Sequence, residues 1–373
     1  MDRRIFAAGL AAFALAGCGG PPPATRVTQA GGLPDDLRPA PNASYDAWVS
    51  RFRARAADQG FSQDLLRRAF AGTGYLPGVV RRDRNQTEFT RTLEDYLAIA
   101  VSEERVSKGQ AAYATHRDTL EAIAARYGVP AHVVTAIWGL ESFYGDRRGD
   151  VPVISATSTL AFDGRRGAFF EQQLVAALRI LENGDTTPGN LVGSWAGAMG
   201  HTQFIPTSYE AFAVDFTGDG RRDIWAEDPS DALASAAAYL DRNGWVSGQS
   251  WGREDPSGSL QPQPGGPRFA TTRNFAVIKR YNNSDAYAIG VGHLSDRILG
   301  GPPLRQPFPP DANGLTKADR VALQERLTAR GFDTGGADGV IGPNSEAAIR
   351  AYQASRGLPV TGVPSLELLR MLG

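Results

Sequence analysis

Along most of the chain, apolar residues recur three and four positions apart, the spacing that places them on one face of an α-helix. This pattern predicts helices over residues 44–59, 62–72, 86–101, 103–127, 168–183, 230–243 and 285–299, besides one between Pro130 and Gly145. Strand patterns are few, and the best of them covers residues 275–281. No unit of about 20–50 residues repeats along the chain. The sequence therefore predicts a mainly α protein with minor β structure.

The helix predicted between Pro130 and Gly145 has an apolar face, and the last residue on that face is a glutamate. Val133, Ile137 and Glu141 are spaced by four residues, so all three lie on one side of it. Burial beside Ile137 and the negative end of the helix dipole both raise the pKa of Glu141. A carboxylic acid that stays protonated near neutral pH suits general acid catalysis of glycosidic-bond cleavage. A buried glutamate bound to an arginine would give the same pattern, and this helix alone does not decide between the two.

Composition and charge narrow the class of protein. The chain has 373 residues, 42% of them hydrophobic and 21% charged, which is typical of a folded, soluble protein of two domains with linkers. A net charge of −1 gives no support for a nucleic-acid partner. Cys18 is the only cysteine, which excludes internal disulfides and thiolate metal sites. None of the four histidines has the His-Glu-x-x-His spacing of a zinc hydrolase.

The N-terminus has the pattern of an exported protein. Residues 1–18 combine two arginines with an apolar run that is too short to span a bilayer. The run ends in Leu-Ala-Gly-Cys18, which resembles the bacterial lipobox, whose cysteine is lipidated; an ordinary secretion signal with an incidental cysteine is the alternative. Gly19, the residue after Cys18, fits the pattern that sorts lipoproteins to the outer membrane. Residues 19–43, rich in Pro, Gly and Ala, are predicted to be a tether. We therefore expect a periplasmic protein with a lipid anchor in the outer membrane.

The C-terminal part is predicted to be a second domain. Residues 301–313 form a Pro-rich linker, and residues 314–373 contain a separate helical pattern. Within it, Asp-Gly-x-x-Gly-x-x-Ser-x-x-Ala-Ile-x-x-Tyr-Gln, from Asp338 to Gln353, resembles the motif of the three-helix peptidoglycan-binding domain. Ser345 replaces the usual threonine of that motif, and either residue can cap the helix that follows the turn.

A long Gly-rich motif carries the most specific resemblance. Gly-x-Glu141-x-x-x-Gly is followed by Gly-Ala-Met-Gly-x-x-Gln-Phe-x-Pro within residues 194–209, where small residues allow two backbone segments to approach closely. Together these motifs resemble the lytic murein transglycosylase B family, which implies a lysozyme-like fold over residues 44–300 and makes Glu141 the catalytic acid and base. The resemblance also places along the saccharide groove Ser194, Met199, Gln203, Tyr239, Tyr281, Asn282 and Tyr287, with Arg165 and Arg166 as further contacts. Taken singly, Tyr239 and Tyr287 also fit core positions, and His201 and Thr202 differ from the residues expected there.

A second motif predicts a cation site. The loop from Asp215 places oxygen ligands at positions 1, 3, 5 and 9, with glycine at position 6, as in an EF-hand for calcium. Position 12 is Ala226 instead of glutamate. In the resembled family the closing carboxylate comes later, here Asp231, although Glu227 and Asp228 leave that choice open; an empty Asp-Gly turn is the alternative. The predicted ligands of a structural Ca²⁺ are Asp215, Thr217, Asp219, Arg221, Asp223 and Asp231.

These observations predict a monomeric lytic transglycosylase that acts on peptidoglycan glycan strands and needs no cofactor for catalysis. It would cleave the β-1,4 bond between N-acetylmuramic acid and N-acetylglucosamine and release a 1,6-anhydro sugar. A muramidase that uses water is the nearest alternative, and it needs a second carboxylate across the ring. A catalytically silent wall-binding protein is an alternative of another class.

Overall fold

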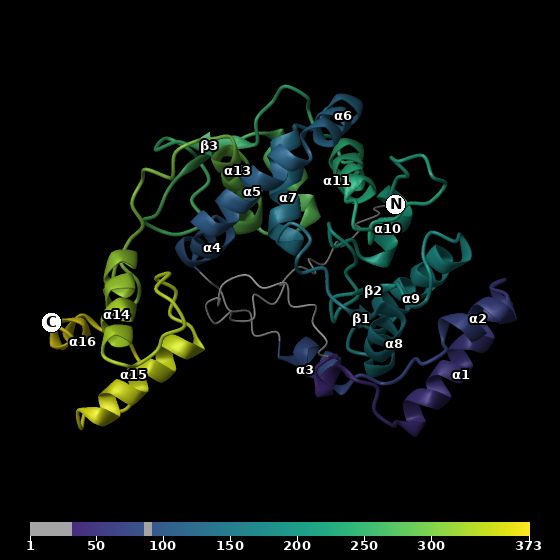
Figure 1. Cartoon of the computed structure of the whole chain (residues 1–373), viewed down its shortest axis with the longest axis horizontal. Helices are drawn as coiled ribbons and strands as arrows, with labels where there is room; N and C mark the ends of the chain where they lie inside the picture. The colour runs from purple at the N-terminus through teal and green to yellow at the C-terminus, as the bar shows by residue number, and fades with distance from the viewer. Residues whose placement is uncertain (1–31, 86–91) are drawn as a thin grey trace.

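The structure, a computed structural model, describes residues 32–85 and 92–373, which fold mainly into α-helices (Figure 1). The export signal, Cys18 and the first part of the tether lie outside the described residues. A 3₁₀ turn, Asp35–Leu37, precedes the helices. In chain order these are α1 (Ala43–Asp58), α2 (Gln63–Ala69), α3 (Pro77–Arg84), α4 (Leu93–Ala100), α5 (Glu103–Thr115), α6 (Arg117–Tyr127), α7 (Ala131–Ser142), α8 (Val153–Asp163), α9 (Gly167–Glu182), α10 (Pro206–Phe212), α11 (Ser230–Arg242), α12 (Arg273–Tyr281), α13 (Asp285–Ile298), α14 (Lys317–Ala329), α15 (Pro343–Ser355) and α16 (Leu366–Met371).

The β structure is limited to two short antiparallel ladders in the described part of the chain. Strand β1 (Val151–Pro152) pairs with β2 (Val192–Gly193), and β3 (Gly252–Glu254) pairs with β4 (Phe269–Thr271). The first ladder ties the start of α8 to the segment just before the Gly-rich motif. None of the described helices combines the length and apolar character needed to cross a membrane. The predicted mainly α fold with minor β structure is confirmed.

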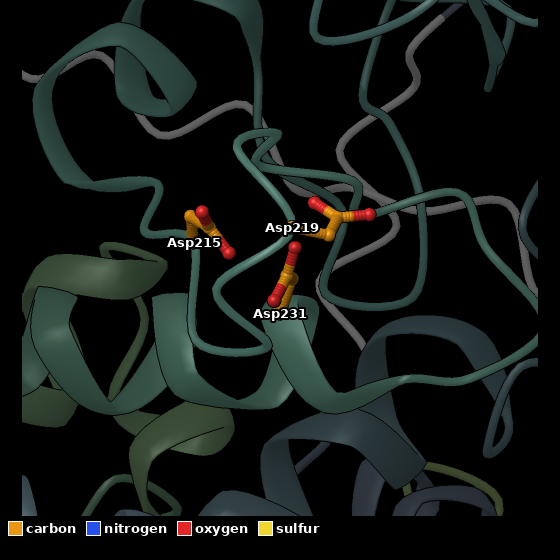
Figure 2. A group of neighbouring side chains, drawn as sticks. All are labelled: Asp215, Asp219 and Asp231. Carbon is orange, nitrogen blue, oxygen red and sulfur yellow. The ribbon is translucent and has the colours of Figure 1, made fainter.

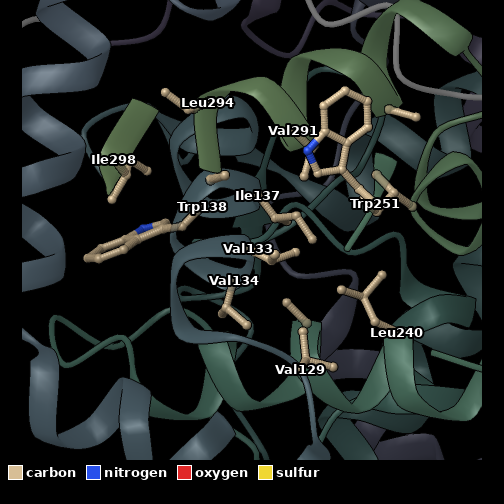
Figure 3. Packing of buried hydrophobic residues seen from close by; sticks show 14 of the residues in the cluster. Val129, Val133, Val134, Ile137, Trp138, Leu240, Trp251, Val291, Leu294 and Ile298 are labelled. Atoms are coloured by element: carbon tan, nitrogen blue, oxygen red, sulfur yellow. The ribbon is translucent and has the colours of Figure 1, made fainter. Parts of the chain in front are cut away.

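Two large hydrophobic cores and a smaller one fill the large domain. The first surrounds α7 and takes side chains from α4 to α6 and from α11 to α13. Figure 3 shows Val133, Ile137 and Trp138 of α7 packed among side chains that include Leu240 of α11 and Val291 of α13. The second core lies among α1, α2, α8, α9 and α10. Tyr239 and Tyr281 pack against both cores, so the junction between the two lies at these rings.

Several local elements differ from the sequence expectation. Residues 275–281, predicted as a strand, belong to α12, because Thr272 caps this helix and its Phe275 and Ile278, three residues apart, are both buried. The helix predicted over 103–127 breaks at His116, which ends α5 and begins α6. The first helix is capped by Asn42, whose side chain accepts the N–H of Tyr45.

The predicted tether is ordered where the structure describes it. Leu37 is buried in a small core with Leu76 and Val79, and Asp36 forms ion pairs with Arg81 and Arg82. Asp36 and Leu37 at the end of the predicted tether therefore lie against α3 of the large domain.

The C-terminal unit has its own core and a cap different from the predicted one. Leu323 and Leu327 of α14 pack with Ile349 and Tyr352 of α15. Ser345 does not cap α15: Gly342 is the N-cap residue and Pro343 opens the helix. The hydroxyl of Ser345 is instead buried and accepts a hydrogen bond of 2.9 Å from Gln324 Nε2, which joins α15 to α14.

A buried arginine docks this unit on the large domain. The side chain of Arg320, on α14, is only 4% exposed and pairs with Glu94 at 2.6 Å and Asp95 at 3.2 Å, both in the first turn of α4. The Pro-rich segment is also held, because the carboxylate of Glu254 in β3 accepts the backbone N–H groups of Arg305 and Gln306. The small unit is therefore fixed to the large one at two places.

We expect the double substitution Glu94→Ala/Asp95→Ala to loosen this docking. It leaves Arg320 buried with one carboxylate, that of Asp311 at 3.4 Å, and breaking a buried ion pair costs about 3–5 kcal/mol. The variant should unfold at a lower temperature and be cleaved faster by protease within residues 301–316. Glu346→Ala, which removes an exposed pair with Arg350 inside the small unit, is the matched control and should change neither property. Equal cleavage rates for the two variants would show that the arginine does not hold the units together.

Candidate active site

Glu141 lies at the end of α7 as a buried acid. Its side chain is 8% exposed, and the hydroxyl of Tyr287 on α13 donates a hydrogen bond of 2.6 Å to its Oε1. Burial raises the pKa of Glu141 to about 8, against the smaller, opposite effect of the Tyr287 hydrogen bond. The expectation of a raised pKa is confirmed. Among the described residues its hydrogen-bond partner is a tyrosine, so the alternative of a glutamate bound to an arginine is wrong.

The chain turns sharply just after Glu141. Phe143 and Tyr144 both have positive φ, 54° and 60°, so α7 ends at Ser142, before the glycine predicted to stop it. Such a conformation is costly for residues other than glycine and needs tertiary contacts to hold it. The ring of Tyr144 supplies them: a Cβ on Gly139 would lie 2.5 Å from this ring, and the hydroxyl donates to the carbonyl of Arg105 at 2.8 Å. Gly139, the first glycine of the Gly-x-Glu motif, has no side chain and therefore leaves room for the ring of Tyr144.

The Gly-rich motif forms a tight, irregular turn opposite the end of α7. Met199 and Phe204 exchange two backbone hydrogen bonds of 2.9 and 3.1 Å. A Cβ on Gly200 would lie 2.3 Å from the carbonyl oxygen of Ile224, which confirms the expected close approach of two backbone segments. Gln203 has a positive φ of 53° and its amide nitrogen donates to the carbonyls of Arg148 and Gly200. Its amide oxygen accepts no hydrogen bond from the described residues, so it remains able to bind a hydroxyl or amide donor.

Three tyrosines form a row that ends at the acid. The rings of Tyr281 and Tyr287 stack at 6.4 Å with an interplanar angle of 14°, and Tyr239 meets Tyr281 edge-on at 4.8 Å. The hydroxyl of Tyr281 donates to the carbonyl of Thr202 at 2.7 Å and thereby ties α12 to the Gly-rich turn. Burial raises the pKa of both Tyr281 and Tyr287, which keeps their hydroxyls protonated as donors.

The other residues that the resemblance places along the groove have partners within the protein. Arg165 and Arg166 both pair with the buried carboxylate of Asp83 on α3, at 2.6 and 2.5 Å. Met199 is fully buried in the second core. Ser194 accepts the backbone N–H groups of Ala196 and Ala198, so it shapes the Gly-rich turn, and Asn282 directly follows α12. Sequence reasoning missed the supporting roles of Arg105 and Tyr144.

Three of the predicted cation ligands lie together. Oxygen atoms of Asp215, Asp219 and Asp231 lie within 4.8 Å of one another, on the loop and on the first turn of α11 (Figure 2). Burial raises the pKa of Asp231, whose oxygens accept the N–H groups of Phe216, Thr217 and Asp223. Two carboxylates on a bent loop and one on the adjoining helix turn are the hard oxygen donors that Ca²⁺ prefers.

The other predicted ligands of the loop are engaged differently. Asp223 turns away from the cluster and accepts the backbone N–H groups of Trp225 and Ala226. The hydroxyl of Thr217 donates to Asp215, and the side chain of Arg221 pairs with Asp219. Of the three candidates for the closing carboxylate, Asp231 lies in the cluster, whereas Glu227 pairs with Arg148 and Asp228 accepts hydrogen bonds from Ser230.

The large domain is mainly helical, carries a buried acid at the end of its central helix, and has a lysozyme-like fold. Residues 44–259 and 254–296 match the family described as transglycosylase SLT domain, and residues 316–372 match the putative peptidoglycan binding domain. The chain therefore belongs to the SLT family of lytic transglycosylases, enzymes that degrade peptidoglycan, and carries a C-terminal peptidoglycan-binding domain.

Individual relatives agree with this assignment. The chain is 32% identical to membrane-bound lytic murein transglycosylase B of Escherichia coli (strain K12), over 74% of this chain and 87% of that protein. SltB3 from Pseudomonas aeruginosa, solved with NAG-NAM-pentapeptide and with NAG-anhNAM-pentapeptide, is 42% and 41% identical, with TM-scores of 0.69 and 0.68 over 89% of this chain and 100% of that one. The Escherichia coli lytic transglycosylase Slt35 in complex with calcium is 28% identical, with a TM-score of 0.58 over 70% of this chain and 94% of that one.

We expect the burial of Glu141 to make stability depend on pH. Its pKa in the folded state, about 8, lies above the ordinary value of 4.5, so the folded state binds a proton that the unfolded state has lost between these pH values. Wild-type stability should fall as pH rises through this window, by roughly 3–5 kcal/mol in total. Glu141→Gln keeps the shape without the charge, and should be more stable than the wild type at pH 8 and equally stable near pH 4. Denaturant unfolding of both proteins at several pH values measures this difference, and a constant difference across the range would contradict it.

Proposed function

We propose that this enzyme cleaves the β-1,4 bond between N-acetylmuramic acid and N-acetylglucosamine without water and releases 1,6-anhydromuramoyl products. The observation that carries the proposal is the surroundings of Glu141. Burial raises its pKa, the Tyr287 hydroxyl is its hydrogen-bond partner, and the segments 142–145 and 194–209 contain no further acidic residue. A retaining hydrolase would need a second carboxylate about 5–5.5 Å away, and an inverting one about 6.5–9.5 Å away. The complex of SltB3 with an anhydro sugar supports the same reaction in a relative.

In this mechanism Glu141 acts first as acid and then as base. Its proton goes to the glycosidic oxygen, and that C–O bond breaks. The substrate's acetamido group stabilises the positive charge that develops at C1. The ionised Glu141 then removes the proton from the C6 hydroxyl, whose oxygen forms the new bond to C1. The atoms balance without water, and the hydroxyl of Tyr287 stabilises the carboxylate between the two steps.

The groove residues are proposed to bind the sugars around this acid. The free amide oxygen of Gln203 can accept from a hydroxyl or acetamido N–H, and the partly exposed rings of Tyr239 and Tyr281 offer apolar edges and faces for sugar C–H groups, whereas the buried Tyr287 acts through its hydroxyl. Ser194 retains its hydroxyl proton for donation, because its oxygen is used only as an acceptor in the described structure. Peptidoglycan strands are the substrate in this proposal, and the C-terminal domain binds the same polymer.

The expected result for Glu141→Gln is a folded protein with almost no activity, because an amide cannot pass a proton between the two oxygens. The wild type, incubated with purified peptidoglycan, should release muropeptides that are lighter by one water than hydrolysis products, which mass spectrometry resolves. Products with a free reducing end would instead identify a muramidase. Binding without any release of products would identify a wall-binding protein.

We also propose that Asp215, Asp219 and Asp231 hold a structural Ca²⁺. The ion would reduce the repulsion among three carboxylates and link the loop to α11, and the calcium complex of Slt35 supports the choice of metal. Chelation should then lower the melting temperature, and added Ca²⁺ should restore it through binding linkage. Asp231→Asn should abolish this response to Ca²⁺. Identical melting curves of the wild type with chelator and with Ca²⁺ would exclude the site.

The location of the enzyme is part of the same proposal. A lipid on Cys18 would hold it at the inner face of the outer membrane, where peptidoglycan is within reach, and the relative from Escherichia coli is described as membrane-bound. Cys18→Ala should move the protein from the membrane fraction to the soluble periplasmic fraction. Membrane association that survives this substitution would contradict the lipid anchor.

A further inference from the structure

His201 of the Gly-rich turn contacts the helix that carries the acid at three points. Its ring nitrogen Nδ1 accepts a hydrogen bond of 3.1 Å from Nε1 of Trp138, on the turn of α7 before Glu141. Its backbone carbonyl accepts one of 2.6 Å from the hydroxyl of Ser142, the residue after Glu141. Its ring also lies over Gly145, where a Cβ would be 2.7 Å from ring atoms. The imidazole, 4% exposed, thus faces the segment on both sides of the acid.

The hydrogen bonds fix the tautomer of this histidine. An indole N–H can only donate, so Nδ1 of His201 must be the acceptor and Nε2 must carry the hydrogen. Nε2 then donates to the carbonyl of Ala226 at 2.8 Å, and the Arg148 guanidinium, 3.3 Å from this protonated nitrogen, cannot donate to it. Burial lowers the pKa of His201 to about 4, which keeps the ring neutral in this role. The imidazole is therefore a two-ended bridge from Trp138 to Ala226.

The far end of the bridge is itself anchored. The backbone N–H of Ala226 donates to the carboxylate of Asp223, and its carbonyl also accepts from the guanidinium of Arg148 at 3.2 Å. Arg148 further donates to the carbonyl of Trp225 and pairs with Glu227. The 223–227 segment, which contains Ala226, is thus held by the side chains of Asp223 and Arg148.

We propose that His201 is a positioning residue for the reaction: its imidazole holds the last turn of α7 against the 223–227 segment and thereby fixes the carboxyl of Glu141 in the groove. The proposal rests on the proposed role of Glu141 as the acid. The Ser142 contact uses a backbone carbonyl, so any residue at position 201 keeps it, whereas only the side chain connects Trp138 to Ala226. Misplacing a catalytic group by about 1 Å costs on the order of 100-fold in rate.

The test uses substitutions that keep one end of the bridge. In His201→Asn the side-chain oxygen can replace Nδ1 as acceptor for Trp138, and in His201→Gln the amide nitrogen can replace Nε2 as donor to Ala226. Because positioning needs both ends, each variant should lose about 10- to 100-fold in kcat on a soluble glycan, with KM unchanged. Trp138→Phe removes the indole N–H that donates to Nδ1 of His201, and so breaks the bridge at its α7 end. Once His201→Asn has broken the bridge at the Ala226 end, this second change should cost little, so the double variant should lose much less than the product of the two single losses.

The pH profile separates positioning from loss of stability. The groups that face Glu141 are the hydroxyl of Tyr287 and the ring of Tyr281, and its raised pKa depends on burial. A carboxyl that moves into water has a lower pKa, so the alkaline limb of kcat in the His201 variants should move to lower pH. His293→Asn is the matched control: His293 is also buried, at 7% exposed, its pKa is also lowered to about 4 by burial, and on α13 it faces a pocket lined by Trp251 and Asp296 instead of Glu141. This control should be less stable than the wild type, but its kcat and the alkaline limb of its pH profile should be unchanged.

The outcomes are distinguishable. If the His201 variants melt at lower temperature but keep wild-type kcat and the wild-type alkaline limb, as expected for the His293 control, then His201 only fills space and the proposal is wrong. The mass of the products reports on the proposed reaction instead, because a muramidase would depend on the position of Glu141 in the same way. A change in product type therefore contradicts the anhydro mechanism and leaves the positioning role standing.

Discussion

The burial of one carboxyl group, that of Glu141, is the constraint on which the rest of the site depends. A carboxylate removed from water without a cation beside it favours its protonated form, and the proton is what a general acid needs. The surrounding residues maintain this state with neutral groups: a tyrosine hydroxyl as the hydrogen-bond partner, stacked tyrosine rings along the groove, and the apolar core around α7. The fold accepts a less stable state at neutral pH in return for a functional group that water would deprotonate.

The two larger cores explain how the structure brings the Gly-rich turn to this acid. Glu141 belongs to a helix of the first core, whereas the Gly-rich turn contributes Met199 and Phe204 to the second. The site therefore depends on keeping the two cores in register. Tyr239 and Tyr281 pack against both, and the Tyr281 hydroxyl bonds to the turn itself. Tyr239 and Tyr281 look like ordinary core residues in the sequence, but they hold the two cores in a fixed relative position.

The sequence predicted what depends on periodicity and on long motifs. It identified the helical class, most helices, the buried acid and the close backbone approach at the Gly-rich turn. It failed where tertiary contacts decide. Residues 275–281 have strand-like side chains but form a helix, because burial of one face against neighbouring helices outweighs local preference. The end of α7 is set by the ring of Tyr144 fitting beside Gly139, a contact with no local signal. Likewise, nothing in the sequence places Arg165 and Arg166 on Asp83 of α3, more than 80 positions away in the chain.

The docking of the C-terminal domain through Arg320 also changes how the two domains can share one polymer. A domain on a loose tether finds its ligand at any separation that the linker allows, and its benefit depends on linker length. Here the Pro-rich segment is pinned to Glu254 and the domain is held by α4, so the separation between wall-binding surface and acid is set by the fold. Simultaneous binding then depends on whether the repeat of the glycan brings a suitable unit to both places at once. The spacing between the two binding positions on a glycan strand would then equal the fixed distance between the C-terminal domain and Glu141. That distance depends on one buried arginine, Arg320.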